Sequence, residues 1–155
     1  MMKRTTPRLL INIALILGLL CFIWGNSLLP GSISGAISDW VKDLLARIFP
    51  GEVPGVTTGG GLLRKIAHFT EFAALGTLLG WLFGMLRKGN LPPILLGMAA
   101  ACVDETIQIF VPGRGPGLKD VAIDTAGVLT GLVLLLIGHT FIKKKTHYNH
   151  LEDTQ

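Results

Sequence analysis

The longest charge-free stretch of the chain, residues 9–38, constrains its fold more than any other feature. Charged residues make up only 15% of the 155 residues, and hydrophobic residues make up 50%. A soluble domain normally carries about a quarter of charged residues. The sequence therefore predicts a membrane protein and disfavours a soluble globular domain.

Four apolar stretches are long enough for helices that cross a bilayer, which takes roughly 20 residues each. They are residues 9–24, 66–86, 91–111 and 121–142. Such segments must be helical, because an isolated strand would leave its backbone groups unpaired in lipid. The predicted fold class is an all-α membrane protein with a bundle of four transmembrane helices. The first segment has no signal-peptidase-like site and is interpreted as an uncleaved anchor.

Residues 33–49, between the first two spans, have the pattern of an amphipathic helix. Ile33, Ile37, Trp40 and Leu44 recur at helical spacing, and serines and charged residues occupy the other face. We expect this extracytoplasmic helix to lie in the outer membrane interface. The alternative is a helix packed on a small extracytoplasmic core. The Pro/Gly-rich connector that follows, residues 50–61, is interpreted as a mobile lid.

The basic residues predict the orientation. Eight of the 14 Lys and Arg residues lie at the N-terminus, at residues 87–88 and at residues 143–145. The positive-inside bias places these segments, and therefore both termini, in the cytoplasm. Because topology and contacts with anionic headgroups explain the net charge of +4, no nucleic-acid partner is expected. Residues 1–145 are expected to form one membrane domain, followed by a polar, disordered cytoplasmic tail at residues 146–155.

Polar side chains gather near the outer ends of the last three predicted spans. They recur three or four residues apart, which places them on one face of each helix: Arg64, His68 and Glu71 on the second span, Asp104 and Gln108 on the third, Asp120 and Asp124 on the fourth, with Lys65 and Arg114 nearby. A single charge at this depth costs about 3 kcal/mol. The group therefore predicts either an outward-facing hydrated pocket with Asp104 near its floor, or ion pairs that only hold the helices together.

The residue types in this cluster suit two kinds of chemistry. His68, Glu71, Asp104 and Asp124 offer nitrogen and oxygen ligands for a divalent cation, and a histidine beside carboxylates suits acid–base catalysis. Cations at the rim of the pocket would hold a phosphate or a carboxylate. Ser27 is the only serine near an outer span end that could act as a nucleophile. Glu105 follows Asp104 on the same helix and is expected to point about 100° away, towards a neighbouring helix.

Glycines at four-residue spacing predict close helix packing in lipid. They are Gly76, Gly80 and Gly84 on the second span and Gly127 and Gly131 on the fourth.

Two motifs resemble the VanZ-like family of bacterial membrane proteins. The first is "RKIAHFTEFAALG", and the second is "DETIQIFVPGRGPGLKDVAIDTAGVLTG". The residues that match the family pattern are Lys65, His68, Glu71, Phe72, Asp104, Glu105, Gln108, Pro112, Arg114, Asp120, Asp124 and Gly127. The chain has Asp124 where many relatives carry Asn. The resemblance implies a multi-pass protein of the bacterial cytoplasmic membrane, and the founding member is associated with teicoplanin resistance.

Two functional hypotheses remain open. In the first, the pocket binds, and in an enzymatic version modifies, an anionic envelope lipid or lipid-linked cell-wall precursor. His68, Glu71 and Asp104 would then be catalytic, and the substrate-binding residues would be Arg64, Lys65, Gln108, Arg114, Asp120 and Asp124. In the second, the chain is a non-catalytic membrane factor or a partner of a cell-wall enzyme, and the polar cluster serves helix packing.

Overall fold

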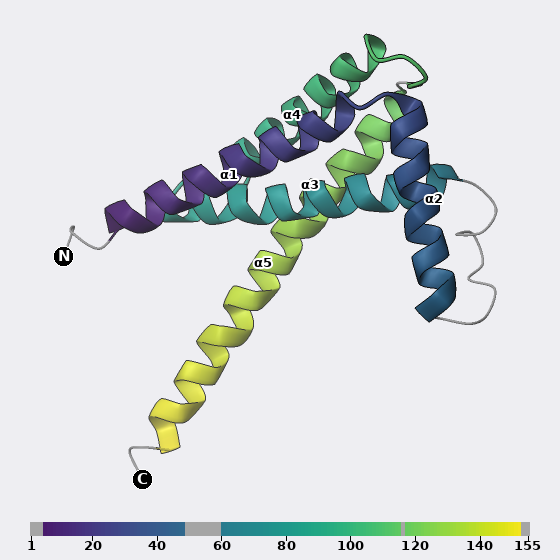
Figure 1. Ribbon diagram of the computed structural model, residues 1–155. Coiled ribbons are helices and arrows are strands. Elements are labelled where there is room, and N and C mark those ends of the chain that lie inside the picture. The colour runs from purple at the N-terminus through teal and green to yellow at the C-terminus, as the bar shows by residue number, and fades with distance from the viewer. Residues whose placement is uncertain (1–4, 49–59, 116, 153–155) are drawn as a thin grey trace.

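The computed structural model describes residues 5–48, 60–115 and 117–152, and over these residues the regular structure is entirely helical (Figure 1). The helices are α1 (Thr5–Ser27), α2 (Gly31–Ile48), α3 (Gly60–Met85), α4 (Leu91–Ile109) and α5 (Leu118–Glu152). The all-α prediction is confirmed, and a helix covers most of each predicted span, although α3 and α4 end one and two residues before the predicted ends at 86 and 111. The proposed lid falls almost entirely outside the described residues.

Within the described part of the chain, three helices are long and apolar enough to cross a membrane. They contain the segments Pro7–Ser27, Gly61–Met85 and Leu118–Phe141. The 19-residue helix α4 is not among them, because Asp104, Glu105 and Gln108 make its C-terminal third polar. The chain is therefore a multi-pass membrane protein, and the fourth predicted span remains a prediction.

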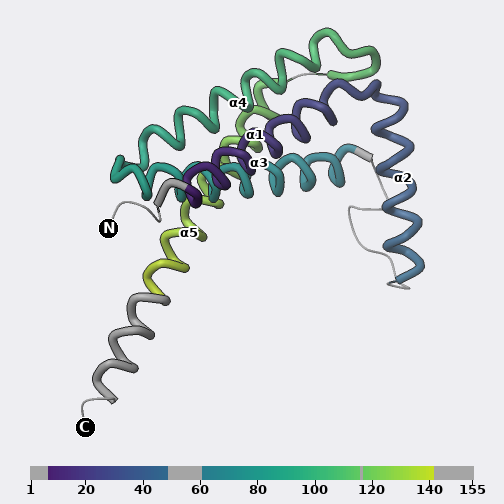
Figure 2. Tube along the Cα trace, turned by 60° about the vertical axis from the view of Figure 1, so that its left-hand side comes forward, coloured from purple at the N-terminus to yellow at the C-terminus, as the bar shows by residue number. Residues whose placement is uncertain are grey.

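Helix α3 lies at the centre of the arrangement and contacts all four other helices. Helices α1, α3 and α4 run side by side, and α5 crosses α3 obliquely (Figures 1 and 2). The buried core between them includes Ile23, Phe72, Leu75 and Val128. The C-terminal ends of α1 and α4 and the N-terminal ends of α3 and α5 lie at the same end of the bundle. This topology brings the polar residues of four separate segments together.

A tight turn reverses the chain between α3 and α4. Arg87 has a left-handed backbone conformation, with φ of 54°. The Lys88 N–H donates to the Phe83 carbonyl at 2.9 Å, and the Arg87 N–H donates to the Gly84 carbonyl at 3.2 Å. This is the Schellman pattern of helix termination, and it returns α4 antiparallel to α3.

Glycines let the backbones of α3 and α5 touch. A Cβ added to Gly76 would overlap the carbonyl of Val128, and one added to Gly131 would overlap the carbonyl of Ala73. Gly80 and Gly127 also face the partner helix, as their spacing predicted. A Cβ added to Gly84 would meet no neighbouring atom within 4 Å. The predicted packing role of Gly84 is therefore wrong, because α5 has diverged from α3 at that depth.

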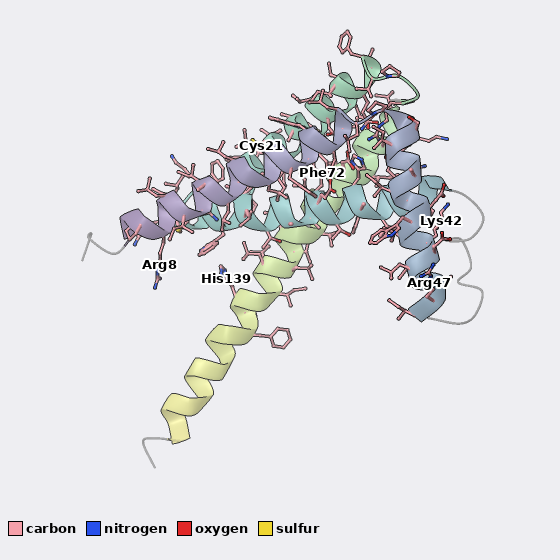
Figure 3. The ribbon with its side chains drawn as sticks, viewed as in Figure 1. Arg8, Cys21, Lys42, Arg47, Phe72 and His139 are labelled. Carbon is pink, nitrogen blue, oxygen red and sulfur yellow. The ribbon has the colours of Figure 1, made fainter. Side chains whose placement is uncertain are left out.

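Helix α2 leaves most of its apolar stripe exposed. Ile33, Ile37, Trp40 and Leu44 are 41–65% exposed, whereas Ser38 on the opposite side is buried. Ile37 and Val41 also border a groove between α1, α2 and α3, and the location of the helix in the membrane interface remains a prediction. Figure 3 shows Lys42 and Arg47 on this helix, at the opposite end of the structure from Arg8 on α1.

Helix α5 is longer than the predicted span at residues 121–142. It continues as one helix to Glu152, so the expectation that residues 146–155 are disordered is wrong for residues 146–152. Its C-terminal half runs away from the other helices (Figure 1).

We expect Gly131→Ala to lower the free energy of unfolding by about 1–3 kcal/mol, because the added methyl group forces α3 and α5 apart. Gly138→Ala on the same helix is the matched control, since nothing lies within 4 Å of its Cβ position. Alanine is favoured over glycine in a helix by about 1 kcal/mol, so this control should be neutral or stabilising. Thermal unfolding of the purified proteins in detergent measures both effects, and equal shifts would contradict the packing described.

Candidate functional site

A group of buried polar side chains lies where α1, α3, α4 and α5 meet. It consists of Ser27 of α1, His68 of α3, Asp104, Glu105 and Gln108 of α4, and Asp124 of α5. Ser27 and Asp104 are fully buried, and Asp124 is 1% exposed. The structure thus brings together four of the predicted site residues, His68, Asp104, Gln108 and Asp124, within an otherwise apolar bundle.

His68 faces two carboxylates from two different helices. Its Nδ1 lies 3.6 Å from Oδ2 of Asp104 and 4.0 Å from Oδ1 of Asp124. Both separations exceed the 2.7–3.2 Å that is typical of an N–H···O hydrogen bond. One ligand atom from each of the three residues lies within 4.8 Å of the other two. The imidazole therefore shares a small space with the carboxylates rather than being directly bonded to either.

Gln108 organises the α4 side of the cluster. Its Nε2 donates to Oδ2 of Asp104 at 2.9 Å and lies 3.3 Å from Oε1 of Glu105 and 3.4 Å from Oγ of Ser27. Because Asp104 accepts the shortest bond, Gln108 orients that carboxylate. Ser27 is buried against this amide, so it does not have the exposure expected of a nucleophile.

Glu105 lies beside the cluster rather than pointing away from it, which corrects the sequence-based expectation. It lines the same pocket as His68 and Asp124, and its Oε2 accepts the Gly117 N–H at 2.8 Å. The turn between α4 and α5 folds back over α4 and supplies this main-chain donor. Glu105 therefore ties the end of α4 to the start of α5.

Arg114 bonds to the end of α1 through two of its three guanidinium nitrogen atoms. Its Nε donates to the Leu29 carbonyl at 3.1 Å, and its Nη2 donates to the Asn26 carbonyl at 2.8 Å. A guanidinium at this position satisfies carbonyls that a helix C-terminus leaves open. Burial lowers the pKa of Arg114, and the nearby charge of Arg64 lowers it further, yet an arginine keeps its proton in proteins. Only Nη1 lacks a partner among the described residues.

Glu71 belongs to a different part of the site from His68. Its Oε1 accepts a hydrogen bond from Nδ2 of Asn26 at 3.4 Å, and it is not one of the three residues that cluster around His68 Nδ1. The predicted grouping of Glu71 with His68 and Asp104 is therefore looser than the spacing suggested, because Glu71 turns towards α1.

Lys65 and Asp120 lie at the mouth of the site. Their Nζ and Oδ1 atoms are 3.9 Å apart, and their side chains are 44% and 26% exposed. An exposed ion pair of this kind contributes little to stability. Arg64 also lies at the mouth, and over the described residues it has no hydrogen bond or ion pair.

Two cavities meet at this site. A small polar pocket with a volume of about 10 Å³ is lined by Lys65, His68, Gln108 and Asp124, among others. A larger groove with a volume of about 390 Å³ lies between α1, α2 and α3, and its apolar lining includes Phe22, Leu29, Ile37, Val41, Leu63 and Ile66. Arg64 and His68 line both cavities.

Three polar residues on α1 have contacts that local sequence spacing did not reveal. Asn26 and Ser27 contact Glu71 and Gln108, as described above. Asn12 is fully buried and donates to the Leu78 carbonyl at 3.3 Å, which links α1 to α3. The sequence feature that could have indicated these contacts is the presence of two asparagines within the longest charge-free stretch.

The fold and the site define a multi-pass helical membrane protein with a buried polar cluster at one end of its bundle. The family model described as VanZ/LLP1 matches residues 10–139, and the chain belongs to this VanZ-like family, as its motifs indicated. No curated protein and no solved structure matches the chain.

We expect Arg114→Lys to lower the free energy of unfolding by about 1–3 kcal/mol, because a single ammonium cannot satisfy both carbonyls in the geometry of the guanidinium fork. Arg64→Lys is the matched control and should leave stability nearly unchanged. Thermal unfolding in detergent provides the comparison. If Arg64→Lys is destabilised as much as Arg114→Lys, the contacts to Asn26 and Leu29 do not account for the loss of stability.

Proposed function

We propose that this VanZ-like protein binds an anionic lipid or lipid-linked precursor of the bacterial cell envelope in an outward-facing pocket. The observation that carries the proposal is the sharing of Arg64 and His68 by a polar pocket and an apolar groove. An amphiphile is the ligand class that matches such a pair of cavities, with its anionic head at the mouth of the small polar pocket and a hydrocarbon chain in the groove.

The size and lining of the groove support this ligand class. Its volume of about 390 Å³ falls within the range of small-molecule sites, which have about 300–1,000 Å³. The groove lies beside α2, whose Ile33, Ile37 and Trp40 are exposed. In the proposal this apolar stripe rests in the outer interface of the bilayer, so that a lipid reaches the groove without crossing water.

The charges at the mouth favour an anionic head. Arg64 lines both cavities without a partner in the described part of the chain, and Lys65 lies beside it. Arg114 lines the groove as well and has its Nη1 free of described partners. A guanidinium recognises phosphate or carboxylate through two parallel hydrogen bonds. In the enzymatic version, His68 would exchange a proton with the bound head, while the carboxylates orient it.

The orientation of the site is part of the proposal. With four spans and both termini in the cytoplasm, the turn at residues 86–90 faces the cytoplasm and the pocket opens outwards. The antiparallel packing of α4 between its neighbours supports the fourth span, because α4 connects opposite ends of the bundle.

Reporter fusions test this topology. We expect a fusion after Lys88 to report a cytoplasmic location and a fusion after Lys119 to report an extracytoplasmic one, because the basic turn is retained inside. An alkaline phosphatase and a fluorescent-protein reporter give opposite readouts at each site. A cytoplasmic signal after Lys119 would contradict the outward-facing pocket.

A packing role for part of the cluster is the second candidate function, and a specific observation favours it. Gln108, Glu105 and Arg114 all bond to other segments of the protein: to Ser27, to the Gly117 N–H and to the Asn26 carbonyl, respectively. These contacts would also be present in a non-catalytic membrane factor or a partner of a cell-wall enzyme.

Filling the groove distinguishes the two candidates. We expect Ala67→Phe to reduce the anionic lipid that copurifies with the protein at least several-fold, because Ala67 lines the groove. Ala74→Phe is the matched control, since Ala74 lies on the same face of α3 two turns away and is also exposed. Native mass spectrometry of protein extracted in mild detergent measures bound phosphatidylglycerol against phosphatidylethanolamine.

The same pair of variants, together with Arg64→Ala, extends the test to cells. In a glycopeptide-sensitive bacterial host, the wild-type protein and Ala74→Phe should shift teicoplanin sensitivity, and Ala67→Phe and Arg64→Ala should not, at equal membrane levels. If neither groove variant changes lipid binding or sensitivity, the lipid proposal is wrong and the packing role is favoured.

A further inference from the structure

We propose that His68, Asp104 and Asp124 bind one divalent metal ion of the zinc type within the polar pocket. The three residues come from α3, α4 and α5, so an ion here would also join the three helices. The inference goes beyond lipid binding and does not rest on it, because an ion can occupy this position whether or not the groove holds a lipid.

The two distances from His68 fit ligands of one ion better than direct hydrogen bonds. Zinc binds nitrogen and carboxylate oxygen at about 2.0–2.2 Å, so two of its ligand atoms lie no more than about 4.4 Å apart. The distances from Nδ1 of His68 to the Asp104 and Asp124 oxygens, 3.6 and 4.0 Å, lie below this limit. They are also too long for hydrogen bonds.

Unpartnered oxygen atoms of the carboxylates provide the second, independent observation. Oδ1 of Asp104 and both carboxylate oxygens of Asp124 are buried without a hydrogen-bond partner in the described part of the chain. The two residues are 0% and 1% exposed. Carboxylates buried in this way are costly unless they are paired or coordinate a metal. An ion of charge +2 among them supplies the missing compensation.

The surroundings of the three residues resemble those of a metal centre. Gln108 Nε2 donates to Oδ2 of Asp104 at 2.9 Å, and polar partners of this kind orient metal ligands. One imidazole with two carboxylates favours zinc or a similar transition metal over magnesium, which prefers oxygen ligands alone. Three protein ligands leave a coordination position open towards the pocket, where a phosphate oxygen or water can bind.

A bound ion would give the pocket a defined chemical capacity. It acts as a Lewis acid that polarises a phosphoryl or carbonyl oxygen in the open position. The cations at the mouth, Arg64 and Lys65, would then hold the rest of an anionic head.

Metal analysis of the purified full-length protein tests the site. The protein is stripped with a chelator in detergent, freed of lipid, and dialysed against Zn²⁺ or Mg²⁺ alone. We expect elemental mass spectrometry to find one zinc ion per wild-type chain. The unfolding temperature should rise with Zn²⁺, and Mg²⁺ should give neither effect. His68→Ala and Asp124→Asn should bind zinc at least tenfold more weakly, since even loss of an outer-shell partner weakens metal sites about 10–100-fold.

Glu71→Gln is the matched control, because Glu71 lies one turn from His68 on α3 but outside the three proposed ligands. It should keep the full zinc content. If His68→Ala fails to fold, Asp124→Asn carries the comparison, since it preserves the shape of the side chain. Zinc well below one equivalent in folded wild-type protein, or undiminished zinc affinity in the ligand variants, overturns the proposal. Because lipid is absent, neither result depends on the groove, which Ala67→Phe tests separately.

Discussion

The close contact between the backbones of α3 and α5 is the constraint on which the rest of the structure depends. Gly127 lies against the carbonyl of Phe69, the residue that follows His68, and it is one helical turn beyond Asp124. The helices cannot approach this closely with larger side chains at the contact. Since α3 and α5 are fixed against each other at this depth, the imidazole of His68 is held beside the carboxylate of Asp124. The glycines thus set the geometry of the polar site, although they take no part in its chemistry.

The polar atoms of the cluster fall into two groups that differ in their partners. Gln108, Glu105 and most of Arg114 bond to other protein groups, and these bonds join the turn between α4 and α5 to the ends of α1 and α4. The carboxylate oxygens of Asp124, one oxygen of Asp104 and Nη1 of Arg114 have no such partners over the described residues. A packing role accounts for the first group but leaves the cost of burying the second unexplained. A ligand would contribute most to stability by pairing with the buried atoms of this second group.

Helical spacing within each span predicted a common face for the residues of α3, α4 and α5 that the structure brings together: His68, Asp104, Gln108 and Asp124. The same spacing also grouped Glu71 with His68, and it could not predict that Glu71 turns towards Asn26 of α1. Glu105 could not be predicted in the same way, because its partner is a main-chain N–H delivered by a turn twelve residues further along. The contacts of Arg114 with the end of α1 span more than eighty residues. Gly84 follows the glycine spacing but lies beyond the point at which α3 and α5 separate, which depends on their crossing angle.

The position of His68 links the two cavities in a way that limits what the site can act on. A molecule whose head reaches the imidazole from the polar pocket lies next to the groove, because the same side chain lines both spaces. The groove is lined mainly by apolar residues, among them Ile37 and Val41 of α2, and the rest of the apolar stripe of α2 is exposed beside it. A fully water-soluble ligand would gain nothing from this surface, since the apolar lining contributes only when it covers hydrocarbon. A ligand with a hydrocarbon chain gains from both cavities at once, so the arrangement favours substrates that remain anchored in the membrane while their heads are bound.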